Sequence, residues 1–563
     1  MVHCSKTLTF FLLFFSILAC RQSADHAIPT DPAMIEKGHQ LFLLHCSACH
    51  NLQQSGIGPA LGGITQQVDA AWLTDFIKQP QRMTEAGDVR AIQLFAQYKQ
   101  PMPSFEHLGD TAITSLLAFL HTTSPPNTAD TLAGLTNPIQ DTIVLSSLIL
   151  NLEKYLQLPA SGEKPTTRIN KMDVAANTGR VFIHDLRGQL YEIIHDRPQL
   201  YLDVAKELPA FVPQPGLGTG FGSWAFHPRF AENGLLYTTH TEPARTKPAD
   251  FALPDSLPIA LQWVLSEWKA DRPHQHKFRG SRREIMRIDV FSGIHGVQDI
   301  AFHAQAQHGD EDYGLLYVCL GDGGSVENGQ AWIADHSAQR PWSSILRIDP
   351  SGSNSKNGQY SIPTGNPWAN DTDTLTLGES YAIGFRNPHR LIWDDAGDLF
   401  ATDIGHKTIE ELNKIIPGAH YGWPEREGTF RLDYQQDMSK VFDLKPEDDV
   451  RPFTYPLVQY DHSEGGAISG GYFLKTSSFG TIYICGDIVS GRLFFTPWPV
   501  QETVAPVSLQ EWRIRYKGKL TTFQDLCKNS RVDLRFGRDG QGHVFILTKA
   551  DGMVYRISMA EEL

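Results

Sequence analysis

The spacing of apolar residues along the chain changes near residue 168. Residues 32–45 and 112–121 place apolar side chains at helical spacing, which is typical of amphipathic helices. From residue 168 onward the apolar runs are short, follow strand-type spacing and are separated by Gly, Asp and Asn. This pattern predicts a multidomain protein: a small all-α domain over residues 31–125 and an all-β domain over residues 168–563. The residues between them, 126–167, are predicted to be a linker with one apolar packing segment, IVLSSLILNLEKYL.

One four-residue phrase recurs in the predicted all-β region: Gly, any residue, an aliphatic residue and an aromatic residue. It reads GRVF, GLLY, GLLY, GDLF, GTIY and GHVF, beginning at Gly179, Gly234, Gly314, Gly397, Gly480 and Gly542. Spacings of about 55 to 85 residues suit a radial array of four-stranded sheets, in which the phrase is an inner strand after a tight turn. The phrase therefore predicts a six-bladed β-propeller. A β-sandwich or a β-helix with coincidental strings is the alternative.

The longest interruption between phrases falls over residues 242–289 and contains the string SLPIALQWVLSEWKADRP. Propellers carry their functional residues on loops around the central channel. We therefore expect this stretch to be an insertion that forms a lid or a wall.

The N-terminus has the pattern of an export signal. Lys6 precedes a mostly apolar run, residues 8–19, which suits a secretory signal peptide and is too short to span a bilayer. The string ILAC, ending at Cys20, resembles a bacterial lipobox, so residues 1–19 are predicted to be a lipoprotein signal peptide and residues 20–30 a linker. A lipid on Cys20 would anchor the exported protein to a membrane surface, in the periplasm or on the outer cell surface. Ordinary cleavage at the end of the apolar run is the alternative.

Charge and cysteine content narrow the choice of partners. The net charge is −14, the isoelectric point is near 5.9, and no run of five or more Lys and Arg residues occurs, which argues against nucleic-acid binding. Three of the 7 cysteines, Cys319, Cys485 and Cys527, stand outside any motif. Because these cysteines are few and odd in number, we expect them to be small buried apolar side chains and not part of a disulfide framework.

The string HCSACH predicts a haem centre. Cys46, Cys49 and His50 have the Cys-x-x-Cys-His spacing that attaches a c-type haem covalently, with His50 as the proximal iron ligand. The carbonyl of Pro59, in GIGPAL, is placed to accept the proton of the other His50 ring nitrogen. Met102, between two prolines in KQPMPSF, supplies a second axial ligand. Ligation by His and Met leaves no open position for substrate, which indicates electron transfer. The whole segment resembles a class I cytochrome c domain.

Loop strings of the all-β region resemble a second family. GLGTGFGSWAFHPRF, IHGVQDIAF, LGDGGS, SSILRIDPSG and AIGFRNPHRLIWDDAGDLFATDIG occur in the order found in soluble, quinone-dependent glucose and sorbosone dehydrogenase propellers. ELNKIIPGAHYGWPEREG, YDHSEGGAISGGYF and GDIVSGRL are similar to the hedgehog-interacting-protein-like branch. The resemblance implies pyrroloquinoline quinone (PQQ) in the channel, with calcium beneath it.

The resemblance also implies roles for individual residues. His295 stands at the position of the family's catalytic base, which takes a proton from a substrate hydroxyl while hydride leaves for the quinone. Arg386 and Asn387 match an Arg-Asn-Pro loop in which the guanidinium lies over the quinone oxygens. Asp322, in LGDGGS, could orient His295, bind a cation or cap a turn.

Calcium in the family is held by backbone carbonyls, and Gly405-His406 is the matching pair. The chain departs from the family pattern where His389 replaces a glutamine, where Val489 replaces a lysine that grips the quinone, and around Gly218. Losing the lysine removes a charge-assisted contact worth about 1.5 to 3 kcal/mol.

The two predicted modules together favour an extracytoplasmic sugar or alcohol dehydrogenase, because the quinol must release electrons one at a time and a tethered haem can accept them. The electrons would pass to a downstream carrier such as another cytochrome. Two alternatives stay open: a quinone-free carbohydrate- or protein-binding propeller with a separate electron-transfer domain, and a calcium-dependent lactonase-like hydrolase that relies on Asp322 and Asp403.

Overall fold

The structure is a computed structural model of the 563-residue chain. It describes residues 28–562 except for gaps at 48, 56–57, 99–101, 127–133, 164, 215–217, 337–338, 373–375, 436, 449–451, 477–479 and 501–504. The predicted signal peptide and Cys20 lie outside these residues. Among the described helices, none combines the length and the apolar character needed to cross a membrane.

The N-terminal module is helical, as the sequence pattern predicts. Its helices are α1 (Pro32–Leu41), α2 (Ile64–Gln67), α3 (Ala70–Lys78), α4 (Pro80–Glu85), α5 (Val89–Tyr98) and α6 (Gly109–His121), with the π-helical turn η1 (Phe42–Cys46) extending α1 and the 3-10 turn η2 (Glu106–Leu108) preceding α6. Asp31 caps α1 by accepting hydrogen bonds from the amides of Ala33 and Met34, both at 3.0 Å. Helices α1 and α6 cross at Gly38, where an added Cβ would lie 1.9 Å from the carbonyl oxygen of Ser115.

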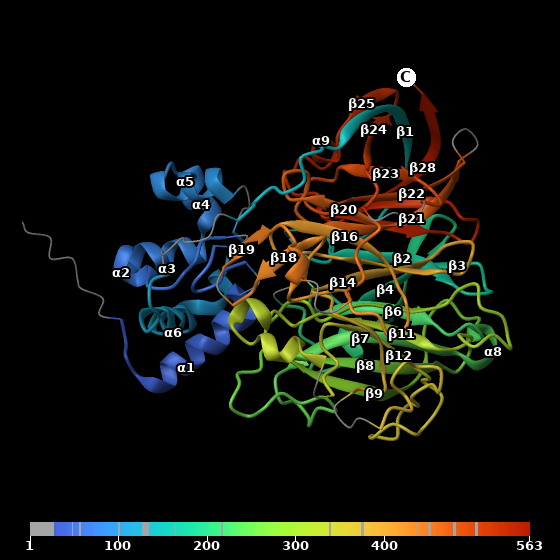
Figure 1. Cartoon of the computed structure of the whole chain (residues 1–563), viewed down its shortest axis with the longest axis horizontal. Coiled ribbons are helices and arrows are strands. Elements are labelled where there is room, and N and C mark those ends of the chain that lie inside the picture. The colour runs from blue at the N-terminus through green and yellow to red at the C-terminus, as the bar shows by residue number, and fades with distance from the viewer. Residues whose placement is uncertain are drawn as a thin grey trace, which may run out of the picture.

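The remainder of the described chain forms six antiparallel four-stranded blades, so the predicted propeller is confirmed. Figure 1 shows them as a large β-domain with the helical module at one side. The blades are β2 (Ile169–Ala175), β3 (Arg180–Asp185), β4 (Gln189–Ile194) and β5 (Arg197–Asp203); β6 (Phe221–Phe226), β7 (Leu235–Pro243), β8 (Leu261–Ala270) and β9 (Gly280–Val290); β10 (Val297–Phe302), β11 (Leu316–Leu320), β12 (Ser344–Ile348) and β13 (Ser380–Ile383); β14 (Pro388–Trp393), β15 (Leu399–Asp403), β16 (Ile409–Lys414) and β20 (Val458–Asp461); β21 (Ile468–Thr476), β22 (Gly480–Asp487), β23 (Leu493–Pro497) and β24 (Gln510–Tyr516); and β26 (Leu534–Arg538), β27 (Val544–Thr548), β28 (Met553–Glu562) and β1 (Val144–Gln157).

The recurring phrase begins the second strand of every blade. All six of its glycines have positive φ, between 68° and 86°. A residue with a Cβ adopts this left-handed conformation at a cost, so glycine is the residue that suits the end of the tight turn between the first two strands. The aliphatic and aromatic positions that follow then enter the strand.

The sixth blade closes the ring with a strand from the start of the domain. β1 pairs antiparallel with β28, for example Leu150 with Ala560, and parallel with the neighbouring β24. β1 lies inside the stretch predicted as a linker, and its sequence is the apolar packing segment of that linker. The first strand of the β-domain therefore begins at Val144 and not at residue 168.

The predicted insertion over residues 242–289 is wrong. Its apolar string forms β8, which pairs with β7 and β9 along its whole length within the second blade. The structure instead has an insertion between β16 and β20, which carries β17 (Arg426–Glu427), β18 (Phe430–Asp433) and β19 (Asp437–Phe442). This insertion lies against the helical module (Figure 1), where the amide of Met438 donates to the side chain of Gln54 at 3.1 Å.

The innermost strand of five blades has a register irregularity close to its N-terminal end. Single residues without a partner on the second strand are Asn170 in β2, Gly222 in β6, Gln298 in β10 and His389 in β14, and β21 has the same irregularity between Ile468 and Gly471. A β-bulge redirects side chains and is common beside functional sites. We call the end of the channel formed by these N-terminal strand ends the upper channel, and the opposite end the lower channel.

Candidate active site and haem centre

The haem-attachment turn has the geometry that the sequence predicts. The amide of His50 donates to the carbonyl of Cys46 at 2.9 Å, which folds the motif into a tight turn after η1. The Nδ1 atom of His50 lies 2.9 Å from the carbonyl oxygen of Pro59, so the predicted contact is confirmed. Because a carbonyl only accepts, Nδ1 carries the hydrogen and Nε2 keeps its lone pair for a metal. Gly58 packs on the ring, and an added Cβ there would lie 2.4 Å from His50 Cε1.

The remaining predicted haem residues lie in the same module. Cys46 is buried within its hydrophobic cluster, and Met102 packs against that cluster, half-buried. Burial lowers the pKa of His50, which favours the neutral imidazole that binds iron. The described residues thus fit a covalently attached haem, with Cys46, Cys49, His50 and Met102 as the residues that would hold it.

His295 and Asp322 form a buried pair at the upper channel. His295 lies just before β10 with a positive φ of 51°, and its Nδ1 atom is 2.7 Å from Asp322 Oδ1. The Gly324 amide donates to the same carboxylate at 2.8 Å, and Trp423 Nε1 donates at 3.2 Å. Burial would raise the pKa of Asp322, but attraction and hydrogen bonding to His295 and the charge of Arg386 lower it. The carboxylate therefore stays ionised, orients His295 and also caps its own turn.

Arg386 is fixed beside this pair by backbone oxygens. Its Nη1 atom donates to the carbonyls of Ile404 at 3.1 Å and Gly405 at 2.5 Å. Its backbone amide and that of Asn387 donate to the carboxylate of Asp403, at 2.9 and 2.6 Å. The Arg-Asn-Pro loop is therefore held rigid, as a site that must present a charge at a fixed place requires.

Glu327 connects these elements, and sequence reasoning missed it. It lies on the 3-10 turn η3 (Val326–Asn328), and its Oε1 atom is 3.0 Å from Arg386 Nη2. The same oxygen is 3.8 Å from His295 Nδ1, and Oε2 is 3.4 Å from His406 Nδ1. A single glutamate in a loop carries no periodic signal, and only its closeness to LGDGGS could have suggested it.

Several buried polar atoms at the upper channel have no hydrogen-bond partner. Among the described side chains they include both ring nitrogens of His389, Arg386 Nε and Asn387 Oδ1. Buried polar groups in native proteins are nearly always paired, so unpaired ones call for a ligand or water. Burial first, and then the charges of Arg390, Arg535 and Lys549, hold the pKa of His389 well below its usual value.

Two arginines lie near Val489, the position at which the family has a lysine. Val489, at the lysine position, accepts a hydrogen bond from the amide of Val532 at 2.9 Å, and Arg531 and Arg535 flank Val532. Arg535 is buried, its Nε donates to Asn170 Oδ1 at 2.9 Å, and burial lowers its pKa to about 9. Arg531 is paired with Asp533 at 2.9 Å, so the charge of Arg535 and the unpaired ring nitrogens of His389 are the groups that fit an anionic cofactor such as PQQ. The signal in the sequence was the alternation RVDLR over residues 531–535.

The backbone groups around Gly405-His406, the pair predicted to bind calcium, already have hydrogen-bond partners within the protein. The carbonyl of Gly405 accepts from Arg386, and the Oε1 atom of Glu427 accepts the amides of His406, Lys407, Thr408 and Ile409 at 2.8 to 3.1 Å. No group of three or more His, Cys, Asp or Glu side chains arranged for a metal occurs among the described residues. These contacts do not fit calcium on the Gly405 carbonyl without movement of the guanidinium.

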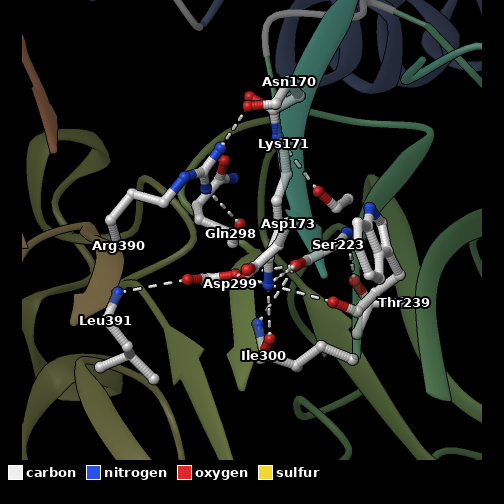
Figure 2. A network of polar contacts seen from close by, with 12 residues as sticks. Asn170, Lys171, Asp173, Ser223, Thr239, Gln298, Asp299, Ile300, Arg390 and Leu391 are labelled. Atoms are coloured by element: carbon white, nitrogen blue, oxygen red, sulfur yellow. Dashed lines mark hydrogen bonds and ion pairs between the residues drawn. The ribbon is translucent and has the colours of Figure 1, made fainter. Parts of the chain in front are cut away.

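The lower channel is closed by a self-contained polar network (Figure 2). Lys171 Nζ donates to Asp299 at 2.8 Å, to the carbonyls of Ile300 at 2.8 Å and Trp224 at 3.0 Å, and to Ser223 at 3.4 Å. Arg390 donates to the carbonyls of three neighbouring residues. A cavity of about 210 Å³ lies below this network, lined by all six innermost strands. It is remote from His295, and its charged floor is already paired.

Comparison with known proteins agrees with the two modules. A cytochrome-like helical module on a six-bladed propeller, with a histidine-carboxylate pair at the channel mouth, defines a redox type of propeller protein. Residues 167–556 match the Glucose / Sorbosone dehydrogenase family and residues 35–124 match the Cytochrome c family. The chain belongs to the Glucose / Sorbosone dehydrogenase family and carries an N-terminal cytochrome c domain.

Individual relatives are distant. HIPL2 protein of Arabidopsis thaliana is 28% identical over 332 residues, covering 50% of this chain and 44% of the relative. Quinoprotein glucose dehydrogenase B of Acinetobacter calcoaceticus is 22% identical over 236 residues, covering 39% and 43%. The chain thus spans less than half the length of these two relatives. The soluble aldose sugar dehydrogenase of Escherichia coli in its apo-form has a TM-score of 0.51 and 16% identity over 74% of this chain and 100% of that one, which shows the fold alone.

Proposed function

We propose that the protein is an extracytoplasmic dehydrogenase that oxidises a hydroxyl group of a small sugar or alcohol in the upper channel and passes the electrons to its own c-type haem. The observation that carries the proposal is the His295–Asp322 pair beside Arg386, at a channel mouth with unmet polar atoms. The relative named a quinoprotein glucose dehydrogenase supports the same chemistry. Export and lipidation at Cys20 remain part of this proposal.

The residues divide the work as follows. PQQ, when bound, supplies the acceptor for the hydride that leaves the substrate carbon. His295 Nε2 takes the proton of the substrate hydroxyl, because Nδ1 is committed to Asp322. Asp322 stabilises the imidazolium that results, and Arg386 and Asn387 would hold the oxygens of the cofactor. Arg535 would pair with a carboxylate of the cofactor.

Two electrons leave each substrate molecule, and one haem carries one electron. Two successive transfers to the haem, each followed by transfer to an external carrier, are therefore needed for each turnover. A covalently joined cytochrome provides this outlet at a high effective concentration.

The test uses the full-length, haem-loaded protein incubated with PQQ and calcium. A panel of aldoses, polyols and alcohols is added while haem reduction is followed optically. We expect at least one substrate to reduce the haem, and His295→Ala to lower the rate by about 10² to 10⁴-fold with an unchanged haem spectrum. Absence of haem reduction together with no retained quinone would show that the dehydrogenase proposal is wrong.

The quinone-free binding module is the second candidate, and the replacements at His389 and Val489 favour it. It predicts that carbohydrate or protein binds without any change in the haem spectrum. The lactonase alternative has less support, because the carboxylates of Asp322 and Asp403 are engaged by His295 and by backbone amides.

A further inference from the structure

The haem-attachment turn touches the propeller on both of its flanks. On one side, the amide of Gly293 donates to the carbonyl of Leu43 at 3.3 Å. On the other side, Asn51 Nδ2 donates to the backbone carbonyl of Glu327. Leu43 stands three residues before Cys46, and Asn51 directly follows His50. The two contacts therefore bracket the Cys-x-x-Cys-His motif.

The partners on the propeller are equally specific. Gly293 stands two residues before His295, and Glu327 is the residue that binds Arg386 and His406. Both contacts thus reach the loops that carry the candidate catalytic groups. A flexible tether between two independent modules would not place both flanks of one motif on these two loops.

The junction is also packed. One hydrophobic cluster contains Phe42 and Leu43 of the helical module together with Phe291 and Trp342 of the propeller, all between 1% and 4% exposed. Burial of this kind excludes water and holds a contact in one geometry. The haem module is therefore seated on the upper channel and not only joined to it.

One short turn connects the two sites. Residues 322–328, which we call the coupling turn, begin with Asp322, the partner of His295, and include Glu327. The turn is closed by the amide of Ser325, which donates to the Asp322 carbonyl at 3.2 Å, and by Asn328 Nδ2, which donates to the Gly324 carbonyl at 2.7 Å. Its carboxylates face the propeller site, while its Glu327 carbonyl receives the haem module.

We propose that the coupling turn is the fixed electron-transfer junction of this protein, with Glu327 and Asn51 as positioning residues. This inference rests on the proposed function and deepens it. Glu327 holds Arg386 and His406 through its carboxylate and the haem-attachment turn through its carbonyl. Glu327 therefore ties the propeller site directly to the haem-attachment turn, while the Gly293 contact and the shared hydrophobic cluster hold the module in place. Each electron that leaves the propeller site reduces one ferric haem, and an external one-electron acceptor reoxidises it.

The first experiment separates the two electron outlets. Asn51→Ser removes the donor to Glu327, while the serine hydroxyl can still accept from the amides of Gln53 and Gln54, which now donate to Asn51 Oδ1. Gln54→Ala is the matched control, because it removes another contact between the modules, that with the Met438 amide. In PQQ-loaded, full-length protein with a substrate, we expect Asn51→Ser to slow haem reduction at least tenfold. Reduction of a small dye such as phenazine methosulfate, which does not depend on the junction, should stay within twofold.

Equal haem-reduction rates in Asn51→Ser and Gln54→Ala would overturn the proposal. So would a parallel loss of dye reduction in Asn51→Ser, since that result would indicate damage to the propeller site itself. Haem content and thermal unfolding of each variant identify a protein that has not folded.

The second experiment needs no quinone and no substrate. Glu327→Gln removes a negative charge beside the haem-attachment turn and leaves the charge of Arg386 in place, so the haem midpoint potential should rise. Glu267→Gln is the control, because Glu267 pairs with Arg283 within the second blade. An unchanged potential in Glu327→Gln would overturn the inference. If no substrate reduces the haem of the wild type, the proposed function fails while this measurement still decides the junction.

Discussion

The two halves of the propeller channel use similar residues in opposite ways. In the lower channel, Lys171 pairs with Asp299, and Arg390 donates to backbone carbonyls of neighbouring strands (Figure 2). In the upper channel, His389 and Asn387 keep polar atoms without partners, although both are buried. In the lower network the protein itself supplies the partners of the charged groups. In the upper channel the unpaired atoms need a ligand or water as their partner.

This difference indicates which end of the channel binds a ligand. A buried charge is tolerated when its partners come from the protein, and an unsatisfied buried group costs about 1 to 3 kcal/mol. The cavity below the Lys171 network is therefore a poorer guide to the site than the unpaired polar atoms of the upper channel. Charge alone would not have distinguished the halves, because both contain buried arginine.

The largest effect is expected from breaking the lower network. Lys171→Met leaves Asp299 buried and without its cation, so the free energy of unfolding should fall by about 3 to 5 kcal/mol. Lys475→Met is the control, because Lys475 and Asp395 form a similarly short pair at 2.9 Å that is exposed. Chemical denaturation followed by tryptophan fluorescence measures both. A similar loss in the two variants would show that the lower network is not a structural plug.

An effect of pH is expected from the acidic residues behind Arg386. Burial, followed by the charges of Glu427 and Glu410, raises the pKa of Glu411 to about 7 from an ordinary value of 4.5. The folded protein therefore holds this proton more tightly than the unfolded chain does. The corresponding stabilisation, about 3 kcal/mol, is present below pH 4.5 and is lost as the pH rises through 7.

Glu411→Gln should remove much of this loss, because the amide does not titrate and its oxygen can still accept from the Gly428 amide. The measurement is the free energy of unfolding at pH 5 and at pH 8. Glu153→Gln, on the exposed face of β1, is the control and should leave the pH dependence as in the wild type. An unchanged pH dependence in Glu411→Gln would contradict the assignment.

The smallest effect is expected on the affinity of the upper channel for PQQ. Arg535→Gln removes an upper-channel cation, so the affinity for PQQ should fall by about 1.5 to 3 kcal/mol, roughly tenfold or more. Arg538→Gln, three residues further along β26 at the lower cavity, should leave that affinity unchanged. Titration calorimetry or quenching of tryptophan fluorescence reports both dissociation constants. An equal loss of PQQ affinity in the two variants would mean that the upper and lower ends of the channel do not differ in binding the cofactor.

The sequence was most informative where the residues of a site lie close together in the chain. Cys46, Cys49 and His50 lie within five residues of one another, and the Pro59 contact follows nine residues later. The recurring phrase also placed the second strand of every blade, because its glycine needs a positive φ wherever the turn occurs. His295 and Asp322 were found through loop strings, although their pairing could not be chosen over turn capping or cation binding.

The failures have a common cause. The stretch that forms β8 is predicted as part of an insertion because both faces of a blade strand are covered by neighbours, which removes the alternation of a half-buried strand. β1 reads as a linker because its partners β24 and β28 are more than 350 residues away in sequence.

By itself, the sequence determined the haem-attachment turn, the number of blades and the family of the propeller, since each depends on residues close together in the chain or on a repeated turn. Only the tertiary structure decided the role of Glu327, the bulged positions of Asn170, Gln298 and His389, and the seating of the haem module on the coupling turn. These features arise where blades and modules meet, and a contact between such distant segments leaves no spacing in the sequence from which it can be inferred.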